Sequence, residues 1–471
     1  MMLKLTLAEI ATLTGGRLHR TDGTPTVTGG VEFDTRRVGR GDLFVAVPGA
    51  RVDGHDFADA ATRAGAVGVL AAREVESPAV IVPGGDGLAG LASLARGVAE
   101  RLHRAGRISV IGVTGSSGKT STKDLIGHLL EPMGATVAPP GSYNNEVGHP
   151  WTVLRADEST RHLVLELGAT APGDIGALCR TAPPRVGVVL NVGSAHLGSF
   201  GSRTAIAATK GELVAALPAA ERGGVAVLNA DDPLVAAMAD RTAARVVRFG
   251  RGAAADVRAV DETLDEQARA WFRLVCPAGE APVALRLHGA HHVANALAAA
   301  SVALELGADL DQVAALLSGA NRRSAHRMAV TTRADGLTVI NDAYNANPES
   351  ARAALESLAA MAKSTGRRSW AVLGPMNELG DAGPGAHAEL GRLAMALGVD
   401  RLVVVGRQAE HTHRSARRAG NGTSTFVPDA HTASTLLHER LRADDIVLVK
   451  ASNVAELWRI AESLLPTTPN G

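Results

Sequence analysis

Short apolar runs alternate with amphipathic stretches over most of the chain. In the middle part, Val- and Leu-rich runs bounded by glycine or polar residues occupy residues 108–113, 162–169, 185–193 and 224–232. Near-continuous apolar runs of this length are typical of strands that are buried on both faces of a parallel sheet. Because helical stretches separate them, the pattern predicts a parallel sheet with helical crossovers, followed by two helices at 291–307 and 310–320.

The same alternation returns in the last third, where strand-like runs occupy residues 337–342, 369–374, 401–406 and 445–450. The first third mixes short apolar runs with alanine-rich helical stretches and closes on a helix at 88–106. We therefore predict an α/β fold of three domains. These are a small N-terminal α/β domain at 1–105, a central parallel-sheet domain with a phosphate-binding loop at 106–322, and a Rossmann-like doubly wound C-terminal domain at 323–471.

Composition narrows the classes of partner. The 471 residues carry 48 basic and 48 acidic side chains, so the excess of positive charge that marks nucleic-acid binders is absent. The two cysteines lie outside any metal-binding spacing, and no apolar run is long enough to cross a bilayer. We expect a cytoplasmic monomer that acts on small molecules and binds neither nucleic acid nor a membrane.

Lysine is scarce: only six of the 48 basic residues are lysine. The chain uses arginine for ordinary solvated charge, so each lysine is a candidate for chemistry that a guanidinium cannot perform. One of them, Lys119, lies in the string "GVTGSSGKTST", between a predicted strand and a predicted helix.

That string has the composition of a phosphate-binding loop. Backbone N–H groups at the helix N-terminus would face phosphate oxygens, Lys119 would bridge the β- and γ-phosphates, and the Thr120 hydroxyl would bind Mg²⁺. The alternative is a glycine-rich turn without function. The predicted nucleotide-binding residues here are Thr114, Gly115, Ser116, Ser117, Gly118, Lys119, Thr120 and Ser121.

Two other polar residues follow predicted strands. Glu166 ends the run at 162–169, and His196 comes just after the run at 185–193. Ligands of open parallel sheets lie at the carboxyl ends of the strands, so both side chains are candidates for the same crevice and for a hard cation. A solvated carboxylate and an ordinary surface histidine are the alternatives. Lys210 on its own would be read as a surface lysine, although the scarcity of lysine weakens that interpretation.

Two asparagine-rich strings, "GSYNNEVGHP" from Gly141 and "NDAYNANPES" from Asn341, each combine a tyrosine with amides. Such side chains suit the binding of a polar substrate, although turn formation explains the same composition. The predicted substrate residues of these strings are Asn144, Asn145, Tyr344, Asn345 and Asn347.

Together these strings resemble the Mur ligase family over nearly the whole chain. "TGSSGKTSTK" is similar to the family's ATP loop, and "LELGATAPGDI" and "NVGSAHLGSFGS" are similar to the strings that hold magnesium. "TKGEL" is similar to the segment with a carbamylated lysine, which maps to Lys210. The resemblance implies a catalytic set of Lys119, Lys210, His196 and Glu166, and a magnesium set of Thr120, Glu166, His196 and Lys210.

Further strings extend the resemblance. "GAHHVANALAA" places His291 and Asn295 near the nucleotide, although Ala290 and His292 depart from the family pattern. "HRM" implies a phosphate contact for Arg327, and "NDAYNANP" implies that Asp342 lies near the ATP ribose. "VLGPMNELGD" is similar to a family string around Glu378, and "LVKASN" has the lysine of another family string at Lys450. "FDTRRVGRGDLF" resembles the uridine-diphosphate site and implies binding by Asp34, Thr35 and Arg36.

The implied reaction uses ATP and Mg²⁺ to add D-alanyl-D-alanine to UDP-N-acetylmuramoyl-tripeptide through an acyl phosphate. Within the family, "AYNANP" and "NNEVGHP" favour the dipeptide-adding type over members that add one amino acid. A folylpolyglutamate synthetase is a second alternative, but about a hundred residues precede the loop here. A nucleotide-gated switch is the third, and the NKxD string expected of it is absent. We expect a hinge at 321–326.

Overall fold

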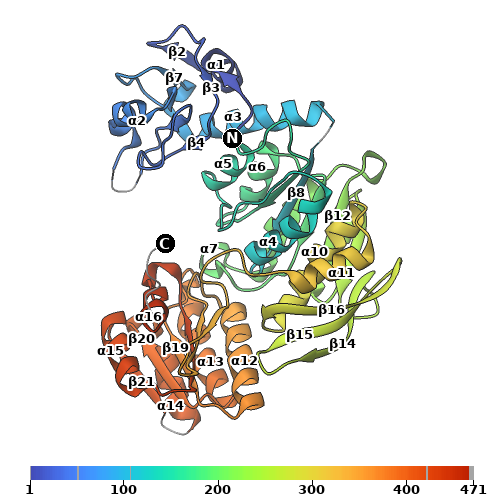
Figure 1. Ribbon diagram of the computed structural model, residues 1–471, viewed down its shortest axis with the longest axis vertical. Helices are drawn as coiled ribbons and strands as arrows, with labels where there is room; N and C mark the ends of the chain where they lie inside the picture. The colour runs from blue at the N-terminus through green and yellow to red at the C-terminus, as the bar shows by residue number, and fades with distance from the viewer. Residues whose placement is uncertain (1, 50–51, 107, 421–422, 466–471) are drawn as a thin grey trace.

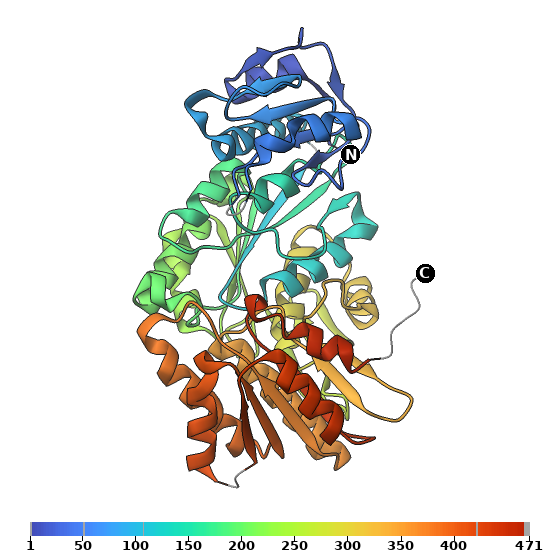
Figure 2. The ribbon, with the colours of Figure 1, turned by 90° about the vertical axis from the view of Figure 1, so that its left-hand side faces the viewer.

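The computed structural model describes residues 2–49, 52–106, 108–420 and 423–465. The chain extends along one axis, with the N-terminal part at one end, the C-terminal part at the other and the middle of the chain between them (Figures 1 and 2). Sheets flanked by helices build all three parts, which confirms the α/β fold. No helix in the described ranges is long and apolar enough to span a membrane.

The N-terminal part contains a five-stranded sheet in the order β2-β7-β6-β5-β4 and a small antiparallel pair, β1-β3. The strands are β1 (Leu5–Thr6), β2 (Arg17–His19), β3 (Thr26–Val27), β4 (Val31–Glu32), β5 (Leu43–Val45), β6 (Gly68–Ala71) and β7 (Ala79–Ile81). The helices are α1 (Leu7–Thr14), α2 (Ala58–Ala64) and α3 (Gly87–Arg104). Asp86 caps α3 by accepting from the N–H groups of Leu88 and Ala89.

The apolar face of α3 packs in two directions. Leu94 and Val98 of α3 share one hydrophobic cluster with Leu7 of the N-terminal part and with Trp151 and Leu163 of the central part. The hydrophobic core therefore continues past residue 105, and the domain boundaries at 105 and 322 stay predictions.

The central sheet has the order β16-β15-β14-β13-β12-β11-β8-β10-β9. Its strands are β8 (Ser109–Thr114), β9 (Thr136–Val137), β10 (His162–Glu166), β11 (Val186–Val189), β12 (Val225–Asn229), β13 (Arg245–Gly250), β14 (Val257–Leu264), β15 (Arg269–Cys276) and β16 (Gly279–His288). The four predicted runs form β8, β10, β11 and β12, which pair in parallel. One face packs on α4 (Lys119–Leu130), α10 (His291–Glu305) and α11 (Leu310–Gly319). The other face packs on α3, α5 (Gly148–Val153), α6 (Asp174–Thr181) and α8 (Arg203–Ala215).

The antiparallel extension β14-β15-β16 was not predicted. Its last strand alternates buried and exposed residues, because one face covers α10 and α11 while the other faces solvent. A search for continuous apolar runs misses such strands, since only alternate positions are apolar.

The C-terminal sheet has the order β17-β18-β22-β19-β20-β21. Its strands are β17 (Ala329–Thr332), β18 (Thr338–Asn341), β19 (Ser369–Leu373), β20 (Arg401–Val405), β21 (Ser424–Val427) and β22 (Ile446–Lys450). Helices α12 (Pro348–Thr365), α13 (Gly383–Ala396) and α14 (Glu410–Ala419) cover one face, and α15 (Ala430–Arg440) and α16 (Trp458–Ser463) cover the other. The doubly wound arrangement is confirmed, and the two edge strands β17 and β21 were not predicted.

Candidate active site

The glycine-rich loop connects the carboxyl end of β8 to the first turn of α4. Gly118 has a φ of +81°, a conformation that glycine adopts without strain, and Lys119 begins the helix. The loop is held by the segment after β11, because Ser117 donates its N–H to Asn191 Oδ1 at 2.9 Å and Gly193 donates its N–H to Ser116 Oγ at 2.9 Å. These two hydrogen bonds fix the shape of the loop.

Lys119 turns back over this loop and donates to the carbonyl of Gly115 at 2.8 Å. Burial lowers the pKa of the ammonium, and the nearby Glu166 carboxylate opposes that shift. A half-buried ammonium group with one carbonyl partner suits the binding of an anion, because an anionic ligand would stabilise the charge that desolvation destabilises.

Glu166 lies at the end of β10 and accepts from Thr120 Oγ1 at 2.7 Å. Ser142 and Asn144 also donate to this carboxylate, at 2.8 and 2.7 Å. Burial raises the pKa of Glu166, but Lys119, Arg327 and the hydroxyl donors bring the pKa below its usual value. The carboxylate is therefore ionised at neutral pH and lies directly beside the helix N-terminus.

The first asparagine-rich string is both a turn and part of the site. Asn144 donates to Glu166, whereas Asn145 Oδ1 accepts the N–H of Gly148 at 2.9 Å and so forms the turn that leads into α5. Asn145 therefore forms a turn, as the alternative interpretation expected, and the substrate contact of Asn144 stays a prediction.

The other two expected magnesium residues lie differently. His196 follows β11 and pairs through Nδ1 with Glu378 Oε2 at 2.8 Å. Lys210, on α8, is buried and is not among the described residues that line the cavity. Burial and the charge of Lys119 lower its pKa well below the usual value of 10.5, which favours a neutral amine.

The N-terminus of α10 packs against the phosphate loop. Asn295 lies so close that a Cβ on Gly118 would approach its Oδ1 to 2.6 Å, which explains the glycine. His291 stacks on His292 with ring centroids 4.3 Å apart, and burial lowers the pKa of His291 to about 4. The His291 Nδ1 atom is buried without a hydrogen-bond partner among the described residues, so a polar ligand atom could satisfy it.

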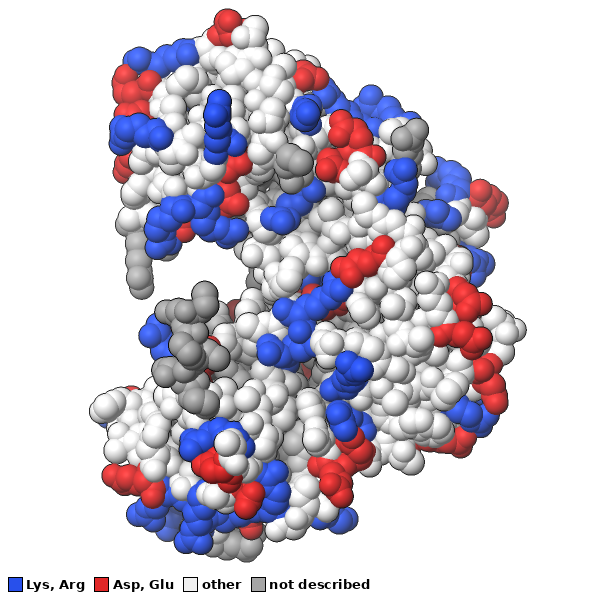
Figure 3. All heavy atoms as spheres, viewed as in Figure 1, with Lys and Arg blue, Asp and Glu red and all other residues white. Residues whose placement is uncertain are grey.

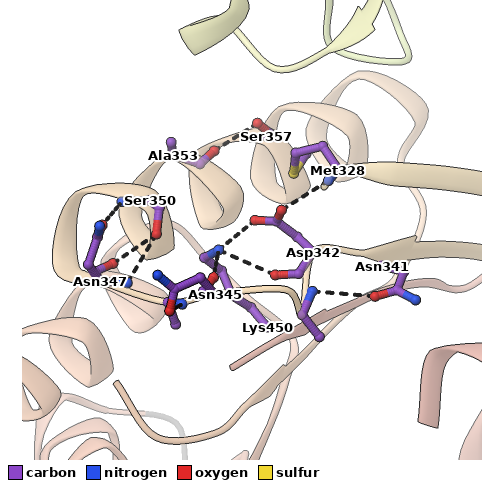
Figure 4. A network of polar contacts seen from close by, with 11 residues as sticks. Met328, Asn341, Asp342, Asn345, Asn347, Ser350, Ala353, Ser357 and Lys450 are labelled. Atoms are coloured by element: carbon purple, nitrogen blue, oxygen red, sulfur yellow. Dashed lines mark hydrogen bonds and ion pairs between the residues drawn. The ribbon is translucent and has the colours of Figure 1, made fainter. Parts of the chain in front are cut away.

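The C-terminal part contributes a second polar network (Figure 4). Asp342 accepts from the N–H of Met328 at 2.9 Å and pairs with Lys450 at 2.6 Å. The buried Lys450 also donates to the carbonyl of Asn345 at 2.9 Å. The guanidinium of Arg327 lies 4.2 Å from the centre of the Tyr344 ring. Two sequence signals pointed to Lys450: the scarcity of lysine and the string "LVKASN".

Asn347 connects this network to the phosphate loop. Its side chain caps α12 through the N–H of Ser350, and its Nδ2 donates to the carbonyl of Ser116 at 3.1 Å. Glu349 likewise accepts from the N–H and hydroxyl of Ser194, at 2.8 and 2.9 Å. Asn347 thus acts here as a helix cap and as a contact between the two sheets, and no sequence signal marked Glu349.

One cavity of about 730 Å³ joins these groups. Among the residues predicted for the site, those that line the cavity are Ser116, Ser117, Gly118, Lys119, Thr120, Ser121, Asn144, Asn145, Glu166, His196, His291, Asn295, Arg327, Asp342, Tyr344, Asn345 and Asn347. Thr114 is buried at the end of β8 and donates to the carbonyl of Leu167, and Gly115 adjoins it.

Asp34, Thr35 and Arg36 lie outside that cavity, in the N-terminal part. Asp34 and Arg36 form a solvent-exposed ion pair at 2.6 Å, and the hydrogen bonds from Arg36 lower the pKa of Asp34 to about 2. The molecular surface is deeply hollowed between the N-terminal and C-terminal parts (Figure 3). The sites predicted for the two ends of a long substrate are therefore separate in space.

Comparison with known proteins places all three parts of the chain in one family. Three family profiles match: "Mur ligase family, catalytic domain" over 28–85, "Mur ligase middle domain" over 113–303 and "Mur ligase, glutamate ligase domain" over 326–453. The chain belongs to the Mur ligase family. The phosphate loop and Glu166 fall in the middle-domain match of that family, and Asp342 and Lys450 fall in the glutamate-ligase match.

Individual Mur ligases match over the full length. The UDP-N-acetylmuramoyl-tripeptide--D-alanyl-D-alanine ligase of Mycobacterium tuberculosis is 51% identical, over 98% of this chain and 98% of that protein. The crystal structure of MurF from Acinetobacter baumannii superposes with a TM-score of 0.86 at 29% identity, covering 98% and 99% of the two chains. MurF ligase from Thermotoga maritima, solved in complex with ADP, has a TM-score of 0.77 at 30% identity, covering 93% and 99%.

Proposed function

We propose that this chain is an ATP-dependent ligase that adds D-alanyl-D-alanine to UDP-N-acetylmuramoyl-tripeptide and so forms the pentapeptide precursor of peptidoglycan. The observation that carries the proposal is that the phosphate loop, Glu166 and the C-terminal Arg327 and Asp342 line one cavity. The full-length similarity to the mycobacterial ligase supports this choice of substrates over a single amino acid.

The reaction needs activation because a carboxylate and an amine do not condense in water. The carboxylate oxygen of the tripeptide attacks the γ-phosphorus of ATP, the bond to the bridging oxygen breaks, and ADP leaves. The amine of D-alanyl-D-alanine then attacks the acyl phosphate, loses a proton and expels inorganic phosphate. Such transfers depend on positioning and charge neutralisation more than on covalent participation of the protein.

We assign the ATP site to residues of both the central and the C-terminal parts that line the cavity. The N–H groups of the loop and Lys119 hold the phosphates, and Arg327 adds a second cation. His291 and Asn295 lie at the nucleoside, and Asp342, held by Lys450, accepts from the ribose hydroxyls.

The donor set beside the loop fits Mg²⁺. The described residues contain no group of three His, Cys, Asp or Glu side chains that could cage a metal. Mg²⁺ in nucleotide sites takes one or two protein oxygens and completes its shell with phosphates and water, so the Thr120 hydroxyl and the ionised Glu166 suffice for one ion. His196 and Lys210 would join Glu166 at a second. When bound, Mg²⁺ neutralises charge on the phosphates and on the acceptor carboxylate.

Lys210 would contribute to that second site as a carbamate. An ammonium would repel the cation, whereas the neutral amine that burial favours can add CO₂ and release a proton. The product is an anion with two oxygens.

The remaining assignments complete the substrate path. Asp34, Thr35 and Arg36 bind the uridine diphosphate in a domain at 1–105, and the amides of Asn144 and Asn145 face the acceptor peptide. Tyr344, Asn345 and Asn347 face the incoming dipeptide from the domain at 323–471. Residues 321–326 form the hinge between that domain and the one at 106–322. Action as a monomer in the cytoplasm also stays a prediction.

The test is phosphate release by the purified protein with Mg²⁺ and ATP. We expect release only when UDP-N-acetylmuramoyl-tripeptide and D-alanyl-D-alanine are both present, together with the pentapeptide mass. Product with a single amino acid instead would identify another ligase of this fold. Slow hydrolysis indifferent to both substrates would identify a nucleotide switch.

A further inference from the structure

The contact between His196 and Glu378 joins two parts of the chain that belong to different sheets. His196 follows β11 of the central sheet, and Glu378 follows β19 of the C-terminal sheet. Both line the cavity, with 26% of the His196 side chain and 56% of the Glu378 side chain exposed. An exposed contact between a histidine and a carboxylate contributes little to stability, so its geometry needs another explanation.

The backbone on both sides is fixed in an uncommon conformation. His196 has a φ of +60° and Glu378 a φ of +66°, a region that side-chain-bearing residues seldom occupy. The Gly198 N–H donates to the carbonyl of Glu378 at 3.1 Å, so the main chains are joined as well as the side chains. Non-glycine residues persist in this region where surrounding contacts over-determine them, and such residues cluster at functional sites.

The turn that carries Glu378 is also held from behind. The buried His387 accepts the N–H of Met376 through Nε2 at 3.2 Å, and Ser452 Oγ accepts the N–H of Asn377 at 3.0 Å. The carboxylate is therefore presented to His196 from a rigid support.

The Nδ1 atom of the His196 ring is the one that contacts Glu378, and this determines what the other ring nitrogen can bind. Glu378 accepts from Nδ1, which places the proton of a neutral imidazole on Nδ1 and leaves the Nε2 lone pair for another partner. A carboxylate on the non-ligating nitrogen is the usual support of a metal-bound histidine, since it fixes the ring and increases its basicity.

We propose that Glu378 is a positioning residue for His196, which orients the imidazole so that Nε2 binds the second divalent cation only when the C-terminal sheet is docked. This inference rests on the proposed function. It gives Glu378 a role at the second cation, separate from the binding of ATP by the loop, Arg327 and Asp342. Glu349 offers a matched comparison, because its carboxylate holds Ser194 of the same loop at 2.8 Å and does not touch His196.

The experiment uses the full-length protein with Mn²⁺, a non-hydrolysable ATP analogue and UDP-N-acetylmuramoyl-tripeptide. Electron spin-echo modulation detects nitrogen bound to Mn²⁺, and a Mn²⁺ titration gives the affinity. We expect the wild type to show an imidazole signal that His196→Ala lacks. Glu378→Leu should lose that signal and weaken Mn²⁺ binding about 10-fold, and Glu378→Gln, which keeps an acceptor, should fall between them. Glu349→Gln should keep both signal and affinity.

The outcomes separate this inference from the function. A wild type that forms the pentapeptide, with the nitrogen signal and Mn²⁺ affinity unchanged in a folded Glu378→Leu, overturns the positioning role alone. Equal losses in Glu378→Leu and Glu349→Gln also overturn it, because the contact would then serve only to dock the sheets. A wild type that neither binds Mn²⁺ with the analogue nor forms product overturns both proposals.

Discussion

At the scale of single residues, the site depends on lysines that are removed from water. Lys210 is buried and Lys119 is half-buried, and desolvation lowers the pKa of each, yet their surroundings differ. The Glu166 carboxylate raises the pKa of Lys119 and so opposes the effect of burial. At Lys210 the positive charge of Lys119 lowers the pKa further. The first lysine is therefore suited to remain a cation, and the second to become a neutral amine.

Replacing Lys119 should abolish turnover without unfolding the protein. We expect Lys119→Ala to lower kcat by about 10³-fold, the range found when a preorganised charge or donor is removed from an active site. Phosphate release in the presence of both substrates measures it. Lys363→Ala, an exposed lysine of α12, is the matched control and should keep full activity. A Lys119→Ala variant with more than a tenth of wild-type activity would contradict the assignment.

Lys210 predicts a pH dependence of stability. In the unfolded chain this amine keeps its proton up to its usual pKa of 10.5, whereas in the folded protein it loses the proton well below that pH. The unfolded state binds more protons between the two pKa values, so the free energy of unfolding rises with pH across that window. Lys210→Met lacks this rise and should be more stable at neutral pH. Urea unfolding across the window in CO₂-free buffer measures both slopes, and equal slopes would refute the depressed pKa.

The carbamate has its own test. Lys210→Ala should lose ligase activity and regain part of it when a short carboxylate such as acetate or formate is added, because the added anion replaces the missing one. The wild type should not respond to the same salt. Full activity of Lys210→Ala without addition would exclude the modification from the mechanism.

At the scale of elements, helix α4 does more than follow the phosphate loop. Its buried Lys123 pairs with Asp124 at 2.7 Å and also donates to the carbonyl of Pro139. Asp124 in turn accepts from Ser324 at 2.6 Å, and Ser324 Oγ accepts the N–H of Gly141 at 2.9 Å. The helix thereby connects the predicted hinge to the loop whose Ser142 and Asn144 hold Glu166.

Removing the Asp124 carboxylate from this network should destabilise the protein. Asp124→Ala leaves the Lys123 ammonium buried without its carboxylate, and we expect a loss of about 3–5 kcal/mol in the free energy of unfolding. The double variant Lys123→Met, Asp124→Leu should lose less, since no charge is then left unpaired. Denaturant unfolding measures the difference. Glu100→Ala, which breaks an exposed pair with Arg96 on α3, should cost about 1 kcal/mol or less. A double variant as unstable as Asp124→Ala would contradict the argument.

At the scale of the whole molecule, the groups that line the cavity come from both the central and the C-terminal parts of the chain, which meet at the segment after β11. The approach there is close, because a Cβ on Gly198 would lie 2.6 Å from the backbone nitrogen of Gly380. Asn347 and Glu349 contact the same region from α12. The described arrangement is therefore a docked one, and the unliganded protein should be able to leave it through the predicted hinge.

Gly198→Ala should prevent that docking while leaving each sheet folded. Gly198 does not have a positive φ, so its backbone accepts alanine, and the atoms nearest to the added Cβ all belong to the 379–380 turn. We expect at least a 10-fold loss of kcat/KM, because a displacement of about 1 Å is enough to cost 10²-fold in rate. Gly385→Ala, whose added Cβ meets nothing within 4 Å, is the control. Small-angle scattering should show that ATP analogue and substrate compact the wild type but not Gly198→Ala. No compaction of the wild type would refute the hinge.

The sequence by itself determined the α/β class, most of the parallel strands and the glycine-rich loop before α4. These features depend on local order: apolar runs of strand length, a glycine where φ is positive, and a lysine and threonine at the start of a helix. It also located Glu166, because a polar residue at the end of a buried strand lies at the ligand-binding edge of the sheet. The parallel strand β13, the alternating strands β14 to β16 and the edge strands were missed, because none of them has a long continuous apolar run.

Only the tertiary structure decided what those residues contact. Asn347 meets Ser116 across 231 positions of the chain, and Lys450 meets Asp342 across 108. No local pattern encodes such pairs. The first forms when the central and C-terminal sheets pack together, and the second forms when β18 and β22 pair within the C-terminal sheet. The same holds for the partner of His196 and for the pKa of Lys210. Both depend on which distant groups approach and on how much water they exclude.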